Sequence, residues 1–264
     1  MVVNFSELHG DASHLIDILA LCEVETFKVM FLRDAMDNPR FLAKLASSPL
    51  CVRIRDLILG AQKRVAERCP TGLLRLLRAG MVLGYLRSME FTCDSWDTLS
   101  PAGALLRDVG QNITTFKLKL LGRAMFEKAN ASADRWRPLQ LSACTRLEVF
   151  RLDAPHYYLL PAMHDISLFA AYADILLGLP PSVRTVRLRL SGDIESALSD
   201  GESAADIASI ERAISEDTRC RFPELEAVVL EFDRVYAAEC AALAARLMPR
   251  LHDLGLLRAV PALS

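Results

Sequence analysis

Hydrophobic residues recur along this chain at one fixed spacing. Leu147, Phe150 and Leu152 show it most clearly. Three apolar residues have this spacing in each copy, and the residues between them differ from copy to copy. The pattern occurs eight times, and its first positions lie 26 to 42 residues apart. The other copies are Val24/Phe27/Val29, Ile54/Leu57/Leu59, Leu86/Met89/Phe91, Ile113/Phe116/Leu118, Val183/Val186/Leu188, Leu225/Val228/Leu230 and Leu251/Leu254/Leu256. A quasi-period of this size predicts stacked repeats, each contributing one short strand.

Helical patterns lie between these strands. Strands are predicted at residues 24–32, 52–59, 85–93, 113–121, 147–152, 183–190, 225–230 and 251–256. The clearest helical spacing covers residues 15–22, 100–109, 161–177, 203–215 and 236–248. Alternating strands and helices of this length predict an α/β fold with a parallel sheet. We expect an N-terminal cap helix within residues 1–23, one repeat domain over residues 24–260 and a tail at residues 261–264.

The variable positions of the predicted strands distinguish two α/β architectures. Successive side chains on a strand point to opposite faces, so the second and third apolar positions share one face and their neighbours share the other. On this second face several middle strands carry charged residues. A closed (β/α)8 barrel would bury those charges in its interior at several kcal/mol each, whereas an open curved sheet would leave them in water. We therefore predict an open, right-handed horseshoe, with the barrel as the alternative.

Five basic residues are expected to line the polar face of the sheet. They are Lys117, Lys119, Arg151, Arg187 and Arg189. Neighbouring strands lie about 4.8 Å apart, so these cations would form a continuous patch. The functional interpretation is a concave site for an acidic or phosphorylated protein partner. The alternative is a solvated face whose charges serve solubility.

Composition and charge narrow the classes of function. The chain is 52% hydrophobic with a net charge of -2, so its overall charge predicts neither a nucleic acid nor a membrane as partner. We expect no membrane span, because no apolar run reaches roughly 18 residues. We also expect no signal peptide, because the start of the sequence, residues 1–7, lacks a basic region and a long apolar run. The seven cysteines are widely spaced and include no C-x-x-C pair. This pattern is typical of reduced thiols, and we expect the protein in the cytoplasm or nucleus.

Aspartates follow several of the predicted strands. They are Asp34, Asp94, Asp153, Asp193 and Asp233. In a (β/α)8 enzyme, carboxylates at strand ends carry catalysis, whereas in a horseshoe they cap the following turn. We favour capping. The sequence has no nucleotide-binding, hydrolase or zinc-protease motif, so we expect no enzyme activity, cofactor or metal.

The chain resembles a known family of repeat proteins. Proline or cysteine just upstream of several copies resembles degenerate leucine-rich repeats; these residues are Cys144, Pro181, Pro223 and Pro249. More narrowly, three stretches resemble the F-box/leucine-rich-repeat proteins that are abundant in mushroom-forming fungi. The three are residues 38–59, residues 86–91 followed by Trp96, and residues 222–230. The resemblance does not extend to the F-box, of which only the cap segment at residues 11–22 would be a remnant.

The resemblance implies a leucine-rich-repeat-like solenoid that recognises another protein on its concave face. It further implies an F-box-like substrate receptor for ubiquitin ligation, with a cullin ligase adaptor as a second protein partner. Lys117, Lys119, Arg151, Arg187 and Arg189 are the residues that we expect to contact the recognised protein.

Overall fold

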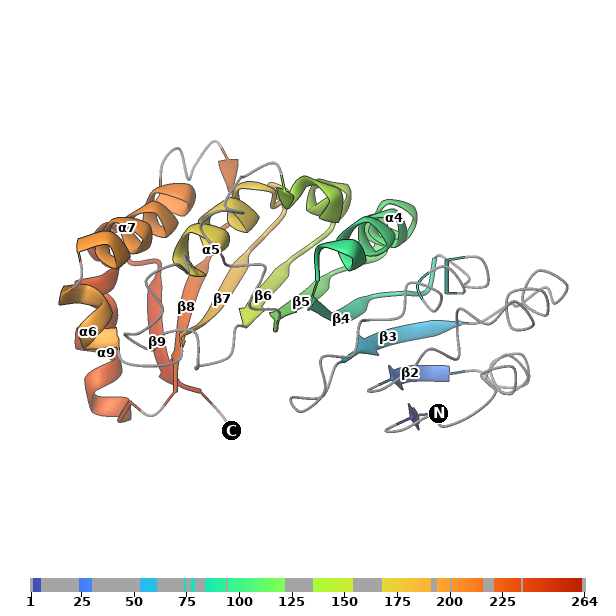
Figure 1. The fold of residues 1–264 in the computed structure, drawn as a ribbon, viewed down its shortest axis with the longest axis horizontal. Coiled ribbons are helices and arrows are strands. Elements are labelled where there is room, and N and C mark those ends of the chain that lie inside the picture. The colour runs from blue at the N-terminus through green and yellow to red at the C-terminus, as the bar shows by residue number, and fades with distance from the viewer. Residues whose placement is uncertain are drawn as a thin grey trace, which may run out of the picture.

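The structure, a computed structural model, describes the chain in separate ranges. These are residues 2–5, 24–29, 53–60, 74, 77–78, 84–93, 95–121, 135–153, 168–190, 194–199, 201–215, 221–233 and 235–262. Within them the chain forms an α/β fold built on one nine-stranded sheet (Figure 1). The strands are β1 (Val2–Phe5), β2 (Val24–Val29), β3 (Ile54–Leu59), β4 (Ser88–Cys93), β5 (Thr115–Leu120), β6 (Val149–Asp153), β7 (Thr185–Leu190), β8 (Ala227–Phe232) and β9 (Leu257–Pro261).

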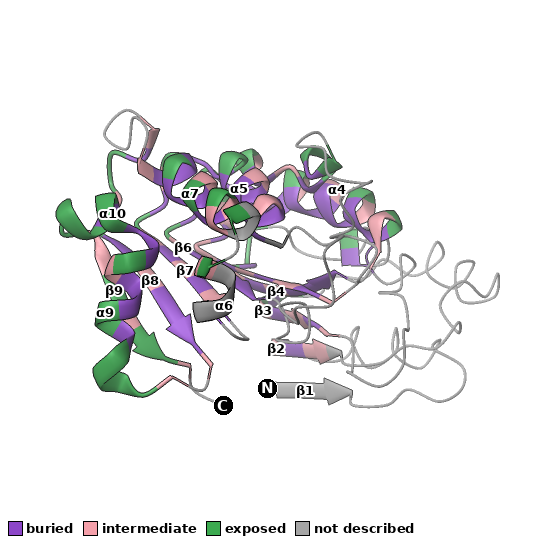
Figure 2. Ribbon diagram, turned by 60° about the vertical axis from the view of Figure 1, so that its left-hand side comes forward, coloured by how far each residue is buried: buried purple, intermediate pink, exposed green. Residues whose placement is uncertain are grey.

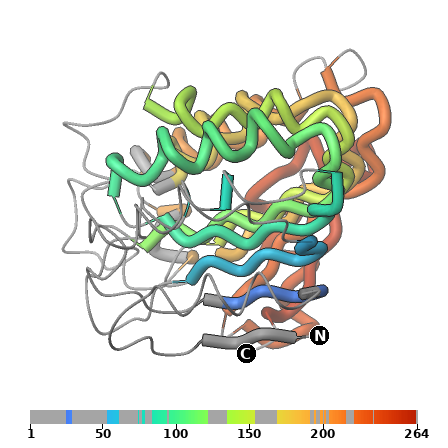
Figure 3. The backbone as a smooth tube through the Cα atoms, turned by 90° about the vertical axis from the view of Figure 1, so that its right-hand side faces the viewer, coloured from blue at the N-terminus to red at the C-terminus, as the bar shows by residue number. Residues whose placement is uncertain are grey.

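All neighbouring strands run parallel, and their order in the sheet is their order in the sequence. The sheet is not closed, since β1 and β9 form its two edges. Figure 1 shows it as an arch with the helices on the convex side, and Figure 3 shows the strands stacked side by side. This arrangement confirms the predicted α/β class and the predicted parallel sheet.

The helices cover one face of the sheet. They are α4 (Leu99–Val109), α5 (Leu168–Leu177), α6 (Ile194–Ser199), α7 (Gly201–Ser215), α9 (Ala237–Leu247) and α10 (Pro249–Asp253). Short 3-10 turns flank α4, namely η2 (Trp96–Thr98) and η3 (Gly110–Asn112), and two more lie between β5 and β6, namely η7 (Arg137–Leu139) and η8 (Leu141–Ala143). Buried residues lie on the sides of α4 and α7 that face the core, and exposed residues lie on their outer sides (Figure 2). The described side chains of α5 are buried or half-buried except Leu177 at its end. The predicted helices at residues 100–109, 203–215 and 236–248 are confirmed within one or two residues of their ends. α5 lies within the helix predicted at residues 161–177. Residues 15–22 and 161–167 fall outside the described ranges.

The recurring apolar positions build the core between sheet and helices. The register aligns Phe116 with Phe150, Phe150 with Val186, and Val186 with Val228. All four side chains are fully buried, and the Phe116 and Phe150 rings stack with centroids 6.2 Å apart. From Phe27 to Leu230 the second and third apolar positions of each copy thus form continuous rows across seven strands, as predicted.

The eighth predicted strand, residues 251–256, is wrong. Pro249 begins the short helix α10, because proline suits the first helical position and its missing N–H would be unbonded there. The buried Glu211 carboxylate on α7 accepts a hydrogen bond of 3.1 Å from the Leu251 N–H, one of the free donors of that helix end. Gly255 then turns the chain at a φ of +69°. The strand therefore comes six residues later, as β9.

Both ends of the sheet differ from prediction. Residues 2–5 form β1, paired with β2, within the segment expected to be a cap helix. At the other edge, Pro261 belongs to β9 rather than to the tail. Leu256 O accepts a hydrogen bond from Val228 N–H of β8, and Ala262 N–H donates one to Phe232 O of β8. Alternate residues of a strand turn their backbone groups to opposite sides, so those of Leu257, Ala259 and Pro261 point away from β8. Proline removes one of these outward donors, which weakens this edge as a template for further strands.

The structure contains no helix among the described residues that is long and apolar enough to cross a membrane.

Two carboxylates meet where α5 packs on α7. Burial, and secondly the charge of Asp206 on α7, raise the pKa of the Asp174 carboxyl on α5 above its usual 3.8. The folded state therefore holds this proton to a higher pH than the unfolded state, and stability is lost as pH rises from about 3.8 through the raised value.

We accordingly expect Asp174→Asn to stabilise the protein at pH 7. Thermal unfolding should show a Tm increase of about 1 to 3 °C, and the gain should vanish below the usual pKa of aspartate, where both proteins are uncharged at this position. Asp97→Asn, at an exposed site on η2, should give no gain. Equal or lower stability of the Asp174 variant at pH 7 would show that the repulsion is absent.

Candidate functional site: a charged face of the sheet

The five predicted basic residues lie together on the face of the sheet opposite the helices. Lys117, Arg151 and Arg187 occupy one row across β5, β6 and β7, because the register pairs each with the next. Lys119 and Arg189 occupy the next row, on β5 and β7, with Asp153 between them. Their strand neighbours Phe116, Phe150 and Val186 point into the core. The alternation of side chains therefore places the cations as predicted.

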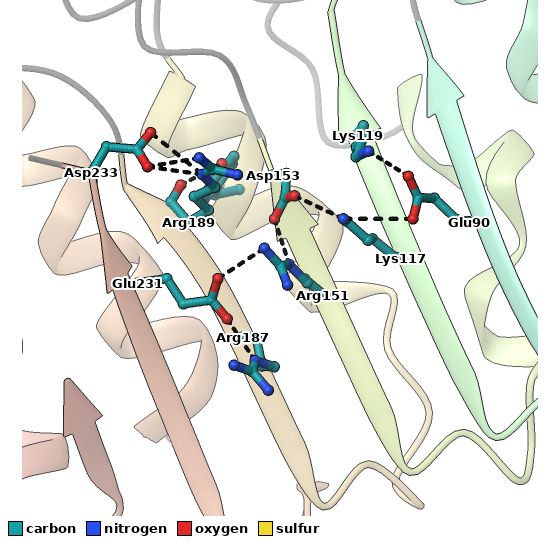
Figure 4. A network of polar contacts seen from close by, with 10 residues as sticks. Glu90, Lys117, Lys119, Arg151, Asp153, Arg187, Arg189, Glu231 and Asp233 are labelled. Atoms are coloured by element: carbon teal, nitrogen blue, oxygen red, sulfur yellow. Dashed lines mark hydrogen bonds and ion pairs between the residues drawn. The ribbon is translucent and has the colours of Figure 1, made fainter. Parts of the chain in front are cut away.

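Four carboxylates interrupt the predicted basic patch. Glu90, Asp153, Glu231 and Asp233 come from β4, from the end of β6 and from β8 and the residue after it (Figure 4). We call these nine residues the charged face. Glu90 flanks the row of Lys117, Arg151 and Arg187, and Asp153 separates Lys119 from Arg189 in the next row, so the face is an ion-pair network with a small positive excess. The prediction of a continuous basic surface is wrong in this respect.

The β4 side of the network is built around two lysines. Lys117 Nζ lies 3.5 Å from Glu90 and 3.3 Å from Asp153. Lys119 forms an ion pair with the other oxygen of Glu90. The Lys117 pKa is lowered, first because burial disfavours the charged ammonium and also because Lys119 and Arg151 are close; Asp153 and Glu90 oppose this effect.

The centre of the network is the carboxylate of Glu231. Its Oε1 accepts a hydrogen bond from Arg187 Nε at 2.6 Å, and its Oε2 forms an ion pair with Arg151 Nη2 at 2.9 Å. Arg151 Nε also donates to Asp153 at 2.9 Å. The Glu231 side chain is only 4% exposed. A carboxylate this buried would be costly without partners, so it holds both arginines in place.

Arg189 and Asp233 form the β8 end of the network. Arg189 Nη2 lies 2.8 Å from Asp233 Oδ1, and Arg189 Nε lies within 3.3 Å of both oxygens. The hydrogen bond and charge of Asp233 raise the Arg189 pKa, although burial opposes this. A planar guanidinium held at two nitrogens has a fixed orientation.

The cations lie nearer to solvent than the carboxylates that hold them. Side-chain exposure runs from 4 to 22% for the four carboxylates and from 22 to 40% for the five cations. Arg187 is the most exposed, and it uses only its Nε among contacts with described residues. Its two terminal nitrogens, with four N–H donors, therefore remain for a ligand. The face presents oriented donors above a layer of carboxylates.

No family model matches this chain, and no curated protein matches it either.

Two of the strand-end aspartates belong to this network. Asp153 pairs with Lys117 and Arg151, and the turn that it was expected to cap lies outside the described residues. Asp233 binds Arg189 across the strands. Asp34, Asp94 and Asp193 lie outside the described residues. Among the residues that the structure does describe, no three histidine, cysteine or acidic side chains group as metal ligands.

Sequence reasoning missed how the charges pair, although it placed most of them. The alternation of side chains already sets Glu90, Asp153 and Glu231 on the polar face. Their pairing needs the register between strands that are far apart in sequence; Arg187 and Glu231 are 44 residues apart. Asp233 lies just after the end of β8, where the alternation no longer assigns a face, so its contact with Arg189 was not predicted.

Proposed function

We propose that this protein is a leucine-rich-repeat-like horseshoe that recognises another protein on its charged face. The observation that carries the proposal is the layered network, in which buried carboxylates orient more exposed cations. Such a face offers preorganised hydrogen-bond donors, so a partner does not have to order these side chains on binding. The open strand order supports the proposed horseshoe. Since the sheet is not closed, a partner can reach its concave face.

The exposed cations favour an acidic partner over a basic one. The described charged face has five cations and four carboxylates, and the carboxylates lie deeper. An approaching anionic side chain therefore meets guanidinium and ammonium groups first. The more specific role as an F-box-like receptor for ubiquitin ligation is supported by the resemblance of three sequence stretches, and it predicts that a cullin ligase adaptor co-purifies with the chain.

We expect the double variant Lys119→Ala/Arg187→Ala to lose the partner. The chain and its variants are used as bait in lysate of the native cells, and captured proteins are quantified by mass spectrometry. Glu231 keeps Arg151 and Glu90 keeps Lys117, so the variant should remain folded in thermal unfolding. The predicted result is a loss of at least tenfold in capture of any protein that binds the wild type.

Arg107→Ala is the matched control for this experiment. Arg107 is exposed on α4, on the convex side of the sheet, so its removal should leave capture unchanged. Equal capture by wild type and the double variant would reject the charged face as the recognition surface. Loss of capture by the Arg107 variant alone would assign recognition to the helical side instead.

A further inference from the structure

We infer that Arg187 and Arg258 form a clamp for one phosphate group of a phosphorylated protein segment. This inference rests on the proposed function and adds to it the chemistry of the partner and a residue outside the charged face. The sequence pattern predicts the last strand at residues 251–256 and therefore assigns no face to Arg258.

The register brings the two arginines to the two sides of one small residue. Arg187 on β7 pairs with Val229 on β8, and Val229 pairs with Arg258 on β9. Leu257 and Ala259 align with the buried Val228 and Leu230 and pack against the core. Arg258 lies between them in the strand and therefore points to the opposite face, the same face as Arg187.

Both guanidinium groups are available to a ligand. Arg187 is 40% exposed and bonds described residues only through Nε. Arg258 is exposed, and it forms no hydrogen bond or ion pair with any residue that the structure describes. Buried Glu231 fixes the base of Arg187, so its terminal nitrogens point away from that carboxylate. One arginine is thus preorganised, and the other is free to close onto a ligand.

The spacing suits one tetrahedral anion. Strands lie about 4.8 Å apart, so the two arginine backbones are roughly 10 Å apart with the short Val229 between them. The face is the concave side of the arch, so side chains that rise from it converge (Figure 1). Both guanidinium groups can therefore reach oxygens of the same phosphate above Val229, where a single carboxylate would offer fewer acceptors.

The charge around the clamp favours an isolated phosphate over a nucleic acid. Arg151, Arg187 and Glu231 together carry a net charge of +1, and Arg258 raises it to +2. This matches the two negative charges of one phosphoserine or phosphothreonine. A nucleic acid running across the strands would bring further phosphates onto Glu231, Asp153 and Glu90, and like charges would repel them. We therefore assign the clamp to a phosphorylated side chain in a protein segment.

The test uses the full chain and an array of peptides that are randomised around a central phosphoserine. Affinities are measured by fluorescence anisotropy for the peptides that the array selects. We expect capture to require the phosphate, and we expect Arg258→Ala and Arg187→Ala each to weaken binding at least tenfold. Arg258→Lys should restore only part of the affinity, since a lysine supplies charge without the planar fork of donors.

Arg250→Ala is the control, because Arg250 is exposed on α10 at a similar place in the sequence but outside the sheet. It should bind like the wild type. The inference is overturned if selected peptides bind equally well after dephosphorylation, or if Arg258→Ala binds them as tightly as the wild type. Inorganic phosphate that competes at the affinity of the peptides would indicate a free-phosphate site, and binding of oligouridylate that depends on Arg258 would indicate RNA.

Failure of the clamp can be told apart from failure of the charged face. If the double variant at Lys119 and Arg187 loses the native partner, while Arg258→Ala and phosphatase treatment of the lysate leave capture intact, the proposed function holds and the clamp is wrong. If the double variant retains the partner, the proposed function itself is wrong. Loss of capture in all three conditions supports both.

Discussion

Replacing Phe150 by aspartate is expected to unfold the protein. Phe150 is fully buried in the centre of β6 and stacks on Phe116. Removing a buried aromatic ring costs about 3 to 5 kcal/mol, and a carboxyl group placed in that site without a partner costs several more. Native domains of this kind are stable by about 5 to 15 kcal/mol. We expect far-UV circular dichroism of the variant to lack a cooperative thermal transition.

Val149→Asp is the matched control for this substitution. Val149 precedes Phe150 on the same strand, but it points to the polar face beside Thr115 and Thr185 and is only partly buried. The same charge one residue away should leave a cooperative transition in place. Phe150→Leu, which keeps an apolar side chain, should lower stability by only about 1 to 2 kcal/mol. If Phe150→Asp melts within a degree or two of the wild type, the register of the sheet is wrong.

The contrast between Val149 and Phe150 shows why the face of each strand was predictable. In an arch with helices on one side, the two faces meet different environments, so a strand shifted by one residue would expose its whole apolar set. The sequence must therefore alternate. Seven of the predicted strands lie where the spacing places them, because Phe150 and its equivalents have few substitutes in a packed core.

The apolar spacing did not predict the two edge strands, β1 and β9. Leu251, Leu254 and Leu256 match the spacing, yet Leu251 is buried in a helix and Leu254 is largely exposed. Spacing alone does not separate a short helix from a strand when leucines are this frequent. β9 carries the small Ala259 at a core position, and β1 has only four residues. An edge strand packs against one neighbour, so weaker apolar patterns suffice there.

The ion-pair network was the least predictable part of the candidate site. Counting only cations predicts a strong basic patch, whereas the structure gives each of the five a carboxylate partner. Exposed ion pairs contribute little to stability, but removing one partner of a buried pair is costly. Glu231 is of the second kind. The network therefore fixes the orientation of the cations on the face, and the terminal nitrogens of Arg187 are the donors that the proposed partner would meet.

Gly103→Ala is expected to destabilise the protein by about 3 kcal/mol, although alanine is the better helix former. Gly103 lies in the middle of α4, where alanine would gain about 1 kcal/mol of helix propensity. However, a Cβ atom at this position would lie 1.6 Å from the carbonyl oxygen of Pro138 in η7. That oxygen belongs to the backbone, so it has no rotamer by which to move away. A contact this short places the overpacking cost above its usual range, at about 4 kcal/mol, so a net loss of about 3 kcal/mol remains after the gain in propensity.

Thermal unfolding of Gly103→Ala should show a Tm lower by about 6 to 12 °C. Gly201→Ala is the control, because Gly201 begins α7 and a Cβ there meets nothing within 4 Å; it should be neutral or slightly stabilising. A Gly103 variant as stable as the Gly201 variant would mean that α4 does not approach η7 this closely. The buried residues of α4 and η7 belong to the same core as Met89, Phe116 and Phe150, so separating α4 from η7 would also disturb the strands that carry Glu90, Lys117 and Arg151. We therefore expect Gly103→Ala, though far from the charged face, to weaken partner capture as well.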